Sequence, residues 1–147
     1  MPVPHIGHQL IVLDSVDSSN NYAMGLARQG LASHGDTFFA LDQRAGKGQM
    51  GRRWVSRPNE NIIISIVLET TGLAPERVFY LSMAMALGTH DWFSGIAGEE
   101  CSLKWPNDIY WRDRKAGGIL IENNWSGSYW QFAITGIGFN VNQVSFE

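Results

Sequence analysis

The chain has 147 residues, the length of one ordinary domain, and a net charge of −3. Its 44% hydrophobic and 17% charged residues exclude a disordered acidic tail and supply enough apolar side chains for a core. The longest apolar run, residues 62–68, is too short to span a membrane, the first ten residues lack a secretory signal, and a single cysteine excludes an internal disulfide. We therefore expect one domain in a reducing cytoplasm.

The first half of the chain predicts one helix among several strands. Residues 10–13 form a short apolar run typical of a strand, and Ser18 or Ser19 can then cap a helix that Gly30 ends. Residues 37–41 are rich in strand-forming types. Residues 62–68 carry the strongest strand signal, because β-branched residues dominate the run and turn residues precede it.

The second half predicts the longest helix and three further strands. Pro75 opens that helix, and its apolar residues recur at helical spacing. Residues 102–105, 118–122 and 130–136 favour strands, and the last two are close enough to form an antiparallel hairpin around residues 126–127. This mixture predicts an α+β fold with a mixed, largely antiparallel sheet flanked by helices, and disfavours a parallel doubly wound sheet.

The basic residues are unevenly distributed along the sequence. Nine of the eleven Lys and Arg residues lie in two short stretches, five within residues 44–57 and four within residues 104–115. A general nucleic-acid binder usually spreads its basic charge over a whole face, and this chain is acidic overall. Two compact cationic segments indicate one small anionic ligand instead.

The first basic segment contains a glycine-rich loop. Residues 46–51 satisfy the G-x-G-x-x-G spacing after a predicted strand, but residues 54–58 lead directly to the next strand and leave no room for a crossover helix. A dinucleotide-binding unit is therefore disfavoured. The glycines would let backbone N–H groups approach an anion, with Lys47 and Arg52 adding charge, and Trp54 could cover a flat ring. An ordinary solvated surface loop explains this segment equally well.

The second basic segment begins with Lys-Trp-Pro-Asn-Asp at residues 104–108. Turn chemistry explains the last three residues but gives no reason for Lys104 or Trp105, and we expect Trp105 to pack in the core. Lys115 precedes two glycines, and residues 136–142 end a strand with two glycines and two amides. Each fragment is weak alone, but their order along the chain is specific.

These fragments together resemble the biotin protein ligases (biotin–[acetyl-CoA-carboxylase] ligases). The matching pieces, in family order, are residues 17–20, 42–43, 46–54, 104–108, 114–118 and 136–142. The resemblance implies the fold class of biotin ligases and class II aminoacyl-tRNA synthetases. It also implies Mg²⁺-dependent reaction of biotin with ATP to give biotinyl-5′-AMP, followed by transfer to a lysine of a biotin carboxyl carrier protein or domain. A homodimer along a sheet edge is implied as well.

The resemblance also assigns roles to individual residues. Implied biotin-binding residues are Ser18, Ser19, Asn20, Gln43, Gly46, Lys47, Gly48 and Gly118. Implied ATP-binding residues are Gly51, Arg52, Arg53, Trp54, Asn107, Lys115 and Asn140. Implied catalytic residues are Lys115, Lys47, Asp108 and Lys104, with Asp108 as the candidate Mg²⁺ ligand.

The sequence departs from the family pattern in the loop and at the ends. Gln49-Met50 stands where many members carry another basic residue, which predicts easier release of the adenylate. Within residues 1–147 no helix-turn-helix pattern precedes the matching pieces, so we expect no DNA binding, and we expect part of the catalytic domain and a small β-barrel to be missing after Asn142. Two alternatives remain open: a lipoate or octanoate ligase or transferase, and a truncated biotin- or nucleotide-binding module without turnover.

Overall fold

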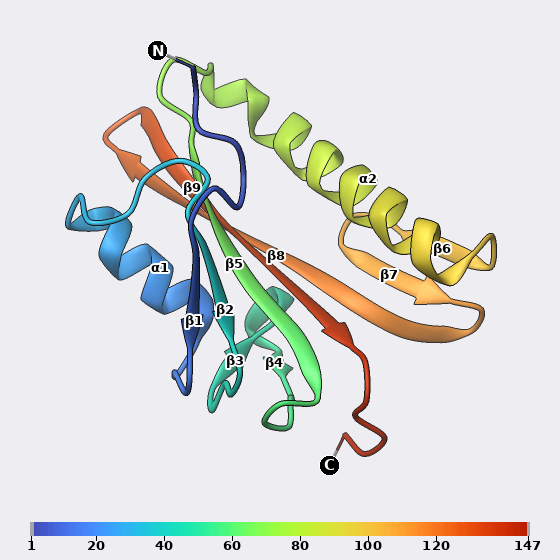
Figure 1. Cartoon of the computed structure of the whole chain (residues 1–147). Helices are drawn as coiled ribbons and strands as arrows, with labels where there is room; N and C mark the ends of the chain where they lie inside the picture. Colours follow the sequence, from blue (N-terminus) through green and yellow to red (C-terminus); the bar gives the residue numbers. More distant parts are fainter. Residues whose placement is uncertain (1, 147) are drawn as a thin grey trace.

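The computed structural model describes residues 2–146 and contains one seven-stranded mixed sheet with a helix on each face (Figure 1). The strands of this sheet run in the spatial order β1-β2-β5-β9-β8-β7-β6, and a separate two-stranded ribbon pairs β3 with β4. The elements of the first half are β1 (Leu10–Leu13), α1 (Ser19–Arg28), β2 (Thr37–Ala40), β3 (Gly46–Lys47), η1 (Gln49–Gly51), β4 (Arg53–Trp54) and β5 (Asn61–Glu69). Those of the second half are η2 (Pro75–Arg77), α2 (Val78–Ala97), β6 (Cys101–Lys104), β7 (Asp108–Trp111), β8 (Arg114–Ser126) and β9 (Tyr129–Asn140).

The sheet is antiparallel except at one edge, where β1 runs parallel to β2. Its centre is the β8–β9 hairpin, which turns at residues 127–128 and pairs Ser126 with Tyr129. The predicted hairpin is therefore confirmed, although both strands extend well beyond their predicted ends. No helix within residues 2–146 is long and apolar enough to cross a membrane.

The two helices cover opposite faces of the sheet. Successive residues of a strand point to opposite faces, so neighbouring residues show which helix covers each face. Val67 and Ile134 pack with Ala23 of α1, whereas Ile66 and Ile137 belong to the core beneath α2. In Figure 1, α1 lies beside the β1–β2 edge and α2 extends toward β6 and β7.

The β7–β8 pairing contains an irregularity that changes which residues share a face. Ile109 pairs with Gly117 and Tyr110 with Lys115, so Ala116 is one extra residue on β8. Ala116 packs against the core on the α2 side, as does Gly117, which lies close to Phe139. Because two successive residues occupy one side at this bulge, Lys115 emerges on the same face as Gly118.

Candidate functional site

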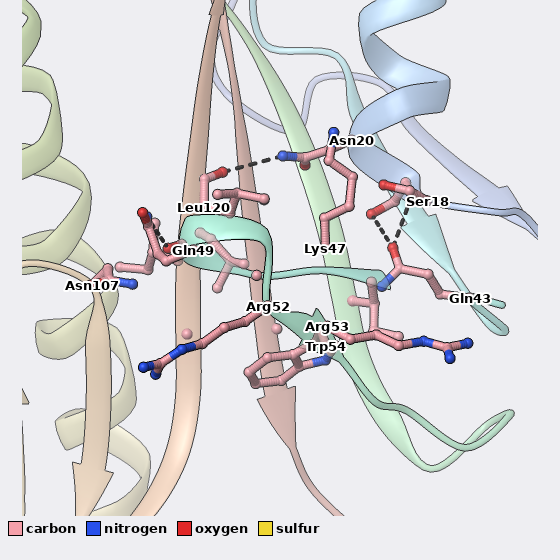
Figure 2. Close-up of a pocket in the computed structure, with 18 of the residues that line it drawn as sticks. Ser18, Asn20, Gln43, Lys47, Gln49, Arg52, Arg53, Trp54, Asn107 and Leu120 are labelled. Atoms are coloured by element: carbon pink, nitrogen blue, oxygen red, sulfur yellow. Dashed lines mark hydrogen bonds between the residues drawn. The ribbon is translucent and has the colours of Figure 1, made fainter. Parts of the chain in front are cut away.

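A cavity of about 260 Å³ lies on the α1 face of the sheet, beneath the glycine loop (residues 46–54) and beside the start of α1. Figure 2 shows Ser18 and Gln43 on one side of this cavity and Asn107 on the other, with the loop passing between them. Both basic segments contribute residues to the lining, and Lys47 and Lys115 line the same cavity. The two segments therefore surround one cavity, as their charge distribution predicts.

Helix α1 begins at the polar side of the cavity because Ser18 caps it. The Ser18 backbone is extended, and its Oγ accepts a hydrogen bond from the Asn21 N–H at 3.3 Å. The chain after β2 runs alongside: Val16 bridges Gln43, and Ala45 N–H donates to the Asp17 carbonyl at 2.7 Å. This pairing carries Gln43 to the start of the helix.

Gln43 and Ser19 are joined by two hydrogen bonds in a buried position. The Ser19 N–H and Oγ–H both donate to Gln43 Oε1, at 2.8 and 3.1 Å. Both bonds use the side-chain carbonyl oxygen of Gln43. Its NH₂ group, which is a donor, has no hydrogen-bond partner among residues 2–146. The hydroxyl of Ser65 donates to Asn20 Oδ1 at 2.6 Å beneath them.

The carboxyl of Asp17, just before α1, has a lowered pKa. Hydrogen bonds from the Asn21 side chain, which is the larger cause, and from the Ser18 backbone hold the pKa of this carboxyl below its ordinary value. The charged form is thereby favoured in the folded chain. Its contribution to stability is present above the ordinary aspartate pKa and is lost as the pH falls through the lowered value.

The floor of the cavity is made by three glycines, Gly118, Gly136 and Gly138. They lie side by side because Gly118 pairs with Gly138, while Gly136 pairs with Leu120 and Ser65. A Cβ on Gly136 would lie 2.4 Å from Asn20 Oδ1, and one on Gly138 would lie 2.8 Å from the Trp54 ring. Only glycine therefore lets Trp54 and Asn20 approach the sheet so closely.

The cationic side of the cavity holds a lysine–carboxylate pair. Lys115 Nζ lies 2.8 Å from Asp108 Oδ1 and 5.7 Å from the centre of the Trp54 ring. Asp108 is largely buried, whereas the Lys115 side chain is 42% exposed and so remains accessible to a ligand. Arg52 and Arg53 diverge from the loop above, Arg52 toward the side of Asn107 and Arg53 toward the side of Gln43 (Figure 2).

Thirteen residues that the resemblance assigns to the site line this cavity. They are Ser18, Ser19, Asn20, Gln43, Lys47, Gly48, Arg52, Arg53, Trp54, Asn107, Asp108, Lys115 and Gly118. Four others are not among its lining residues: Gly46, Gly51, Lys104 and Asn140. Lys104 is exposed on β6, its Nζ 5.9 Å from the Tyr110 ring, and Asn140 lines an adjoining cavity that Lys115 shares.

Several residues of the site are missing from the sequence-based set. Gln49 lies in the lining and donates to the Ile119 carbonyl at 3.3 Å, and Glu122 pairs with Lys47. Ser65, fully buried behind Asn20, was detectable as the one polar residue within the apolar run 62–68. Gly136 and Gly138 were detectable from their alternation with Ile137, which places both on one face of a strand.

The described residues contain no group of three or more His, Cys, Asp or Glu side chains arranged to hold a metal. Asp108 is the carboxylate within the cavity lining. Mg²⁺ is commonly bound by one or two carboxylates together with substrate phosphates, so a single carboxylate fits that ion only where a substrate supplies phosphate oxygens.

Comparisons with known proteins show which family the chain resembles. A profile of the Biotin/lipoate A/B protein ligase family matches residues 12–140. The bifunctional ligase/repressor BirA of Escherichia coli is 34% identical over 79% of this chain and 35% of its own length. The biotin–[acetyl-CoA-carboxylase] ligase of Mycobacterium tuberculosis is 31% identical over 95% of this chain and 52% of its own.

A solved structure shows the same arrangement of elements. The biotin protein ligase from Aquifex aeolicus, in complex with biotin and ATP, is 31% identical and superposes with a TM-score of 0.76, over 95% of this chain and 55% of that chain. The predicted fold class, a mixed and mostly antiparallel sheet of the class II aminoacyl-tRNA-synthetase type, is confirmed. The chain covers between about a third and just over half of the length of these relatives.

Proposed function

Because the chain belongs to the Biotin/lipoate A/B protein ligase family, we propose that it activates biotin with ATP to biotinyl-5′-AMP and transfers the biotinyl group to a carrier lysine. The observation that carries this proposal is that one cavity joins a side of hydroxyls and amides to a side of cations. A ligand for such a cavity has a compact polar head, an apolar stem and an acid group that becomes more negative as it reacts.

The hydroxyl and amide side suits the ureido ring of biotin, which has two N–H donors and one carbonyl acceptor. Ser18 and Ser19 offer hydroxyls, and the Gln43 NH₂ group is available to donate. The Ile63 and Leu120 side chains, beside the floor glycines, suit the valeryl chain. A lipoyl or octanoyl head has no groups to pair with these amides and hydroxyls, which favours biotin over lipoate.

The cationic side suits the first step, in which an oxygen of the biotin carboxylate forms a bond to the α-phosphorus of ATP and pyrophosphate leaves. Both reactants are anions, so fixed positive charge is required where they meet. Lys115 supplies that charge in our proposal, and Arg52 adds to it from the loop. Before substrate arrives, Asp108 holds the Lys115 ammonium in place at 2.8 Å.

The second step needs an acceptor amine. The uncharged ε-amine of a lysine on a biotin carboxyl carrier protein or domain attacks the acyl carbon of the mixed anhydride, AMP leaves, and the amine loses its proton. The new C–N amide bond replaces the acyl C–O bond, and the oxygen that biotin contributed in the first step leaves as part of AMP. The chain's contribution is to exclude water from the anhydride, which the glycine loop above the cavity favours.

Nucleotide and Mg²⁺ binding are proposed for the side of the cavity near Trp54. The buried Trp54 Nε1 and Asn140 Oδ1 have no hydrogen-bond partners among residues 2–146, so they offer one donor and one acceptor to an adenine edge. Asn140 is oriented by donating to the Lys115 carbonyl at 3.3 Å. Asp108, together with phosphate oxygens, would hold Mg²⁺, which neutralises phosphate charge when bound.

Pyrophosphate release tests the proposal directly. The chain is incubated with ATP and Mg²⁺ plus either biotin or lipoate, and ligand binding is measured in parallel by calorimetry. Release with biotin and not with lipoate is expected. Pyrophosphate release with lipoate alone would indicate a lipoate ligase. Biotin binding without pyrophosphate release would indicate a binding module without turnover.

A further inference from the structure

Glu122 is a carboxylate at the edge of the cavity that the proposed reaction does not use. It lies on β8, two residues beyond Leu120, and therefore on the same face of the sheet as the cavity. One of its oxygens, Oε1, pairs with Lys47 Nζ in the glycine loop, and the other, Oε2, accepts from Asn20 Nδ2 at 3.0 Å. A single side chain thus connects the loop to helix α1.

The connection is firm on the helix side because Asn20 is itself held from several directions. Its Nδ2 group also donates to the Leu120 carbonyl at 3.3 Å, and its Oδ1 accepts from the buried Ser65 hydroxyl at 2.6 Å. Asn20 is 4% exposed and Ser65 is fully buried. Glu122 is therefore anchored to buried groups of α1 and β5, and Lys47 is its partner in the glycine loop.

Apart from Trp54, whose ring packs on the floor glycines, the loop has few other attachments to the sheet. Gln49 donates to the Ile119 carbonyl over a long 3.3 Å, and Arg53 bonds to the Arg44 carbonyl, which belongs to the neighbouring loop and not to the sheet. Strands β3 and β4 have only two residues each. Among the described residues, Lys47–Glu122 is the ion pair between loop and sheet, and Lys47 also donates to Asn21 Oδ1 of α1 at 2.8 Å.

We propose that Glu122 is a positioning residue that holds the glycine loop closed over the cavity through Lys47 while it orients the Asn20 amide. The ion pair is only partly exposed, at 39% for the lysine and 27% for the glutamate side chain, so solvent screens it less than a fully exposed pair. The consequence for biotin rests on the proposed function, but the closure is a property of the free chain.

Limited trypsin digestion without substrate tests the closure, because trypsin can cut after Arg52 and Arg53 only when the loop is open. Glu122→Gln is expected to raise the rate of these cuts about tenfold, equivalent to about 1.4 kcal/mol in the opening equilibrium. The matched control is Glu100→Gln, which removes an exposed ion pair with Arg112 far along the sheet. It should leave the loop cuts unchanged.

A double-mutant cycle separates this role from general destabilisation. In a Lys47→Met background the loop is already released, so adding Glu122→Gln should accelerate the Arg52 and Arg53 cuts less than twofold further. Equal acceleration in both backgrounds, or none in either, would overturn the proposal. If Glu122→Gln fails to fold, Glu122→Asp replaces it, since the shorter side chain cannot reach both partners.

Substrate kinetics supply a second readout that a purely structural role would not produce. Opening the loop should raise the KM for biotin and its dissociation rate several-fold and leave kcat within about twofold, because Glu122 touches no reacting atom. Equal losses in kcat and kcat/KM would contradict a positioning role. If wild-type chain binds no biotin, the proposed function fails while the digestion still decides the closure; if biotin binds and digestion is unchanged, the closure alone fails.

Discussion

Trp54 is held against the sheet by the absence of side chains beneath it. Its ring lies where a Cβ on Gly138 would come within 2.8 Å and a Cβ on Gly118 within 3.1 Å. Real Cβ atoms do not approach a ring that closely, so any larger residue must move the indole. The position of the aromatic surface offered to a ligand is therefore determined by glycines on strands far away in the sequence.

Gly138→Ala should displace Trp54 and destabilise the fold by about 1–3 kcal/mol, the usual cost of overpacking. Urea unfolding measures the loss, and the KM for ATP should rise in the same variant because the indole has moved. Gly95→Ala in α2 is the matched control. A Cβ at Gly95 would meet no atom within 4 Å, and the residue lies in a helix interior. The substitution should therefore raise the free energy of unfolding by about 0.5–1 kcal/mol.

Lys115→Ala should slow adenylate formation by about 10²–10³-fold, or roughly 2.7–4 kcal/mol, by analogy with the loss of one transition-state donor. The physical reason is that its ammonium faces the cavity beside Asp108 and Trp54. Single-turnover pyrophosphate release is the measurement. Arg112→Ala, which removes an exposed basic residue paired with Glu100, is the control, and a Lys115→Ala effect below threefold would exclude contact with the reacting phosphate.

The glycine loop is the element on which we expect ligand retention to depend. Its backbone reverses through Met50, at φ 54° with a 95% exposed side chain, and Gly51, at φ 74°. A methionine in this left-handed region is unusual, and its exposure indicates that packing does not hold it there. The loop is instead tied by side chains at its base, Lys47 and Gln49.

Gln49→Arg should slow release of the adenylate, because a guanidinium at this position of the cavity lining adds a charge-assisted bond to the phosphate. About a tenfold lower dissociation rate is expected, which stopped-flow fluorescence of the bound intermediate would measure. Gln49→Met, with similar length and no charge, separates charge from size. Equal rates in wild type and Gln49→Arg would remove the idea.

The elements that the sequence predicts correctly are those with local signals. The Ser18 cap places the start of α1, and the β-branched run places β5. Strands β3, β4 and β7 are not predicted, since runs of two to four residues become strands only by pairing with partners. The core position expected for Trp105 is wrong: it is 46% exposed and packs edge-to-face on Phe79 at the surface.

At the scale of the whole molecule, the long central strands provide most of the framework. Strands β5, β8 and β9 are paired on both sides, and the cavity floor lies on β8 and β9. The two ends of the site approach each other because this sheet brings residues 18–20, 43 and 115–118 to one face. Resemblance predicts these residues, but their geometry depends on strand register, which the sequence alone does not specify.

Hydrogen exchange should be slower in the central paired strands than in the short and edge strands. Backbone amides of β5 and β9 are expected to exchange slowest, close to the rate set by global unfolding, because these strands are buried and paired on both sides. Amides of β3 and β4, and of the edge strand β6, should exchange at least 10²-fold faster, as expected for elements that open locally. Uniform protection across these strands would show that the loop opens only when the whole chain unfolds.

The extra residue on β8 has a consequence for transplanting this site. In a regular strand Lys115 would point toward α2, and Ala116 would take its place above the floor glycines. The Lys115 ammonium therefore faces the cavity because of an interruption of the strand pairing, and residue type alone would not place it there. If every side chain were copied onto a regular hairpin, this cation would lie on the α2 side of the sheet. Such a design could fold well, but its cavity would lack the Lys115 charge.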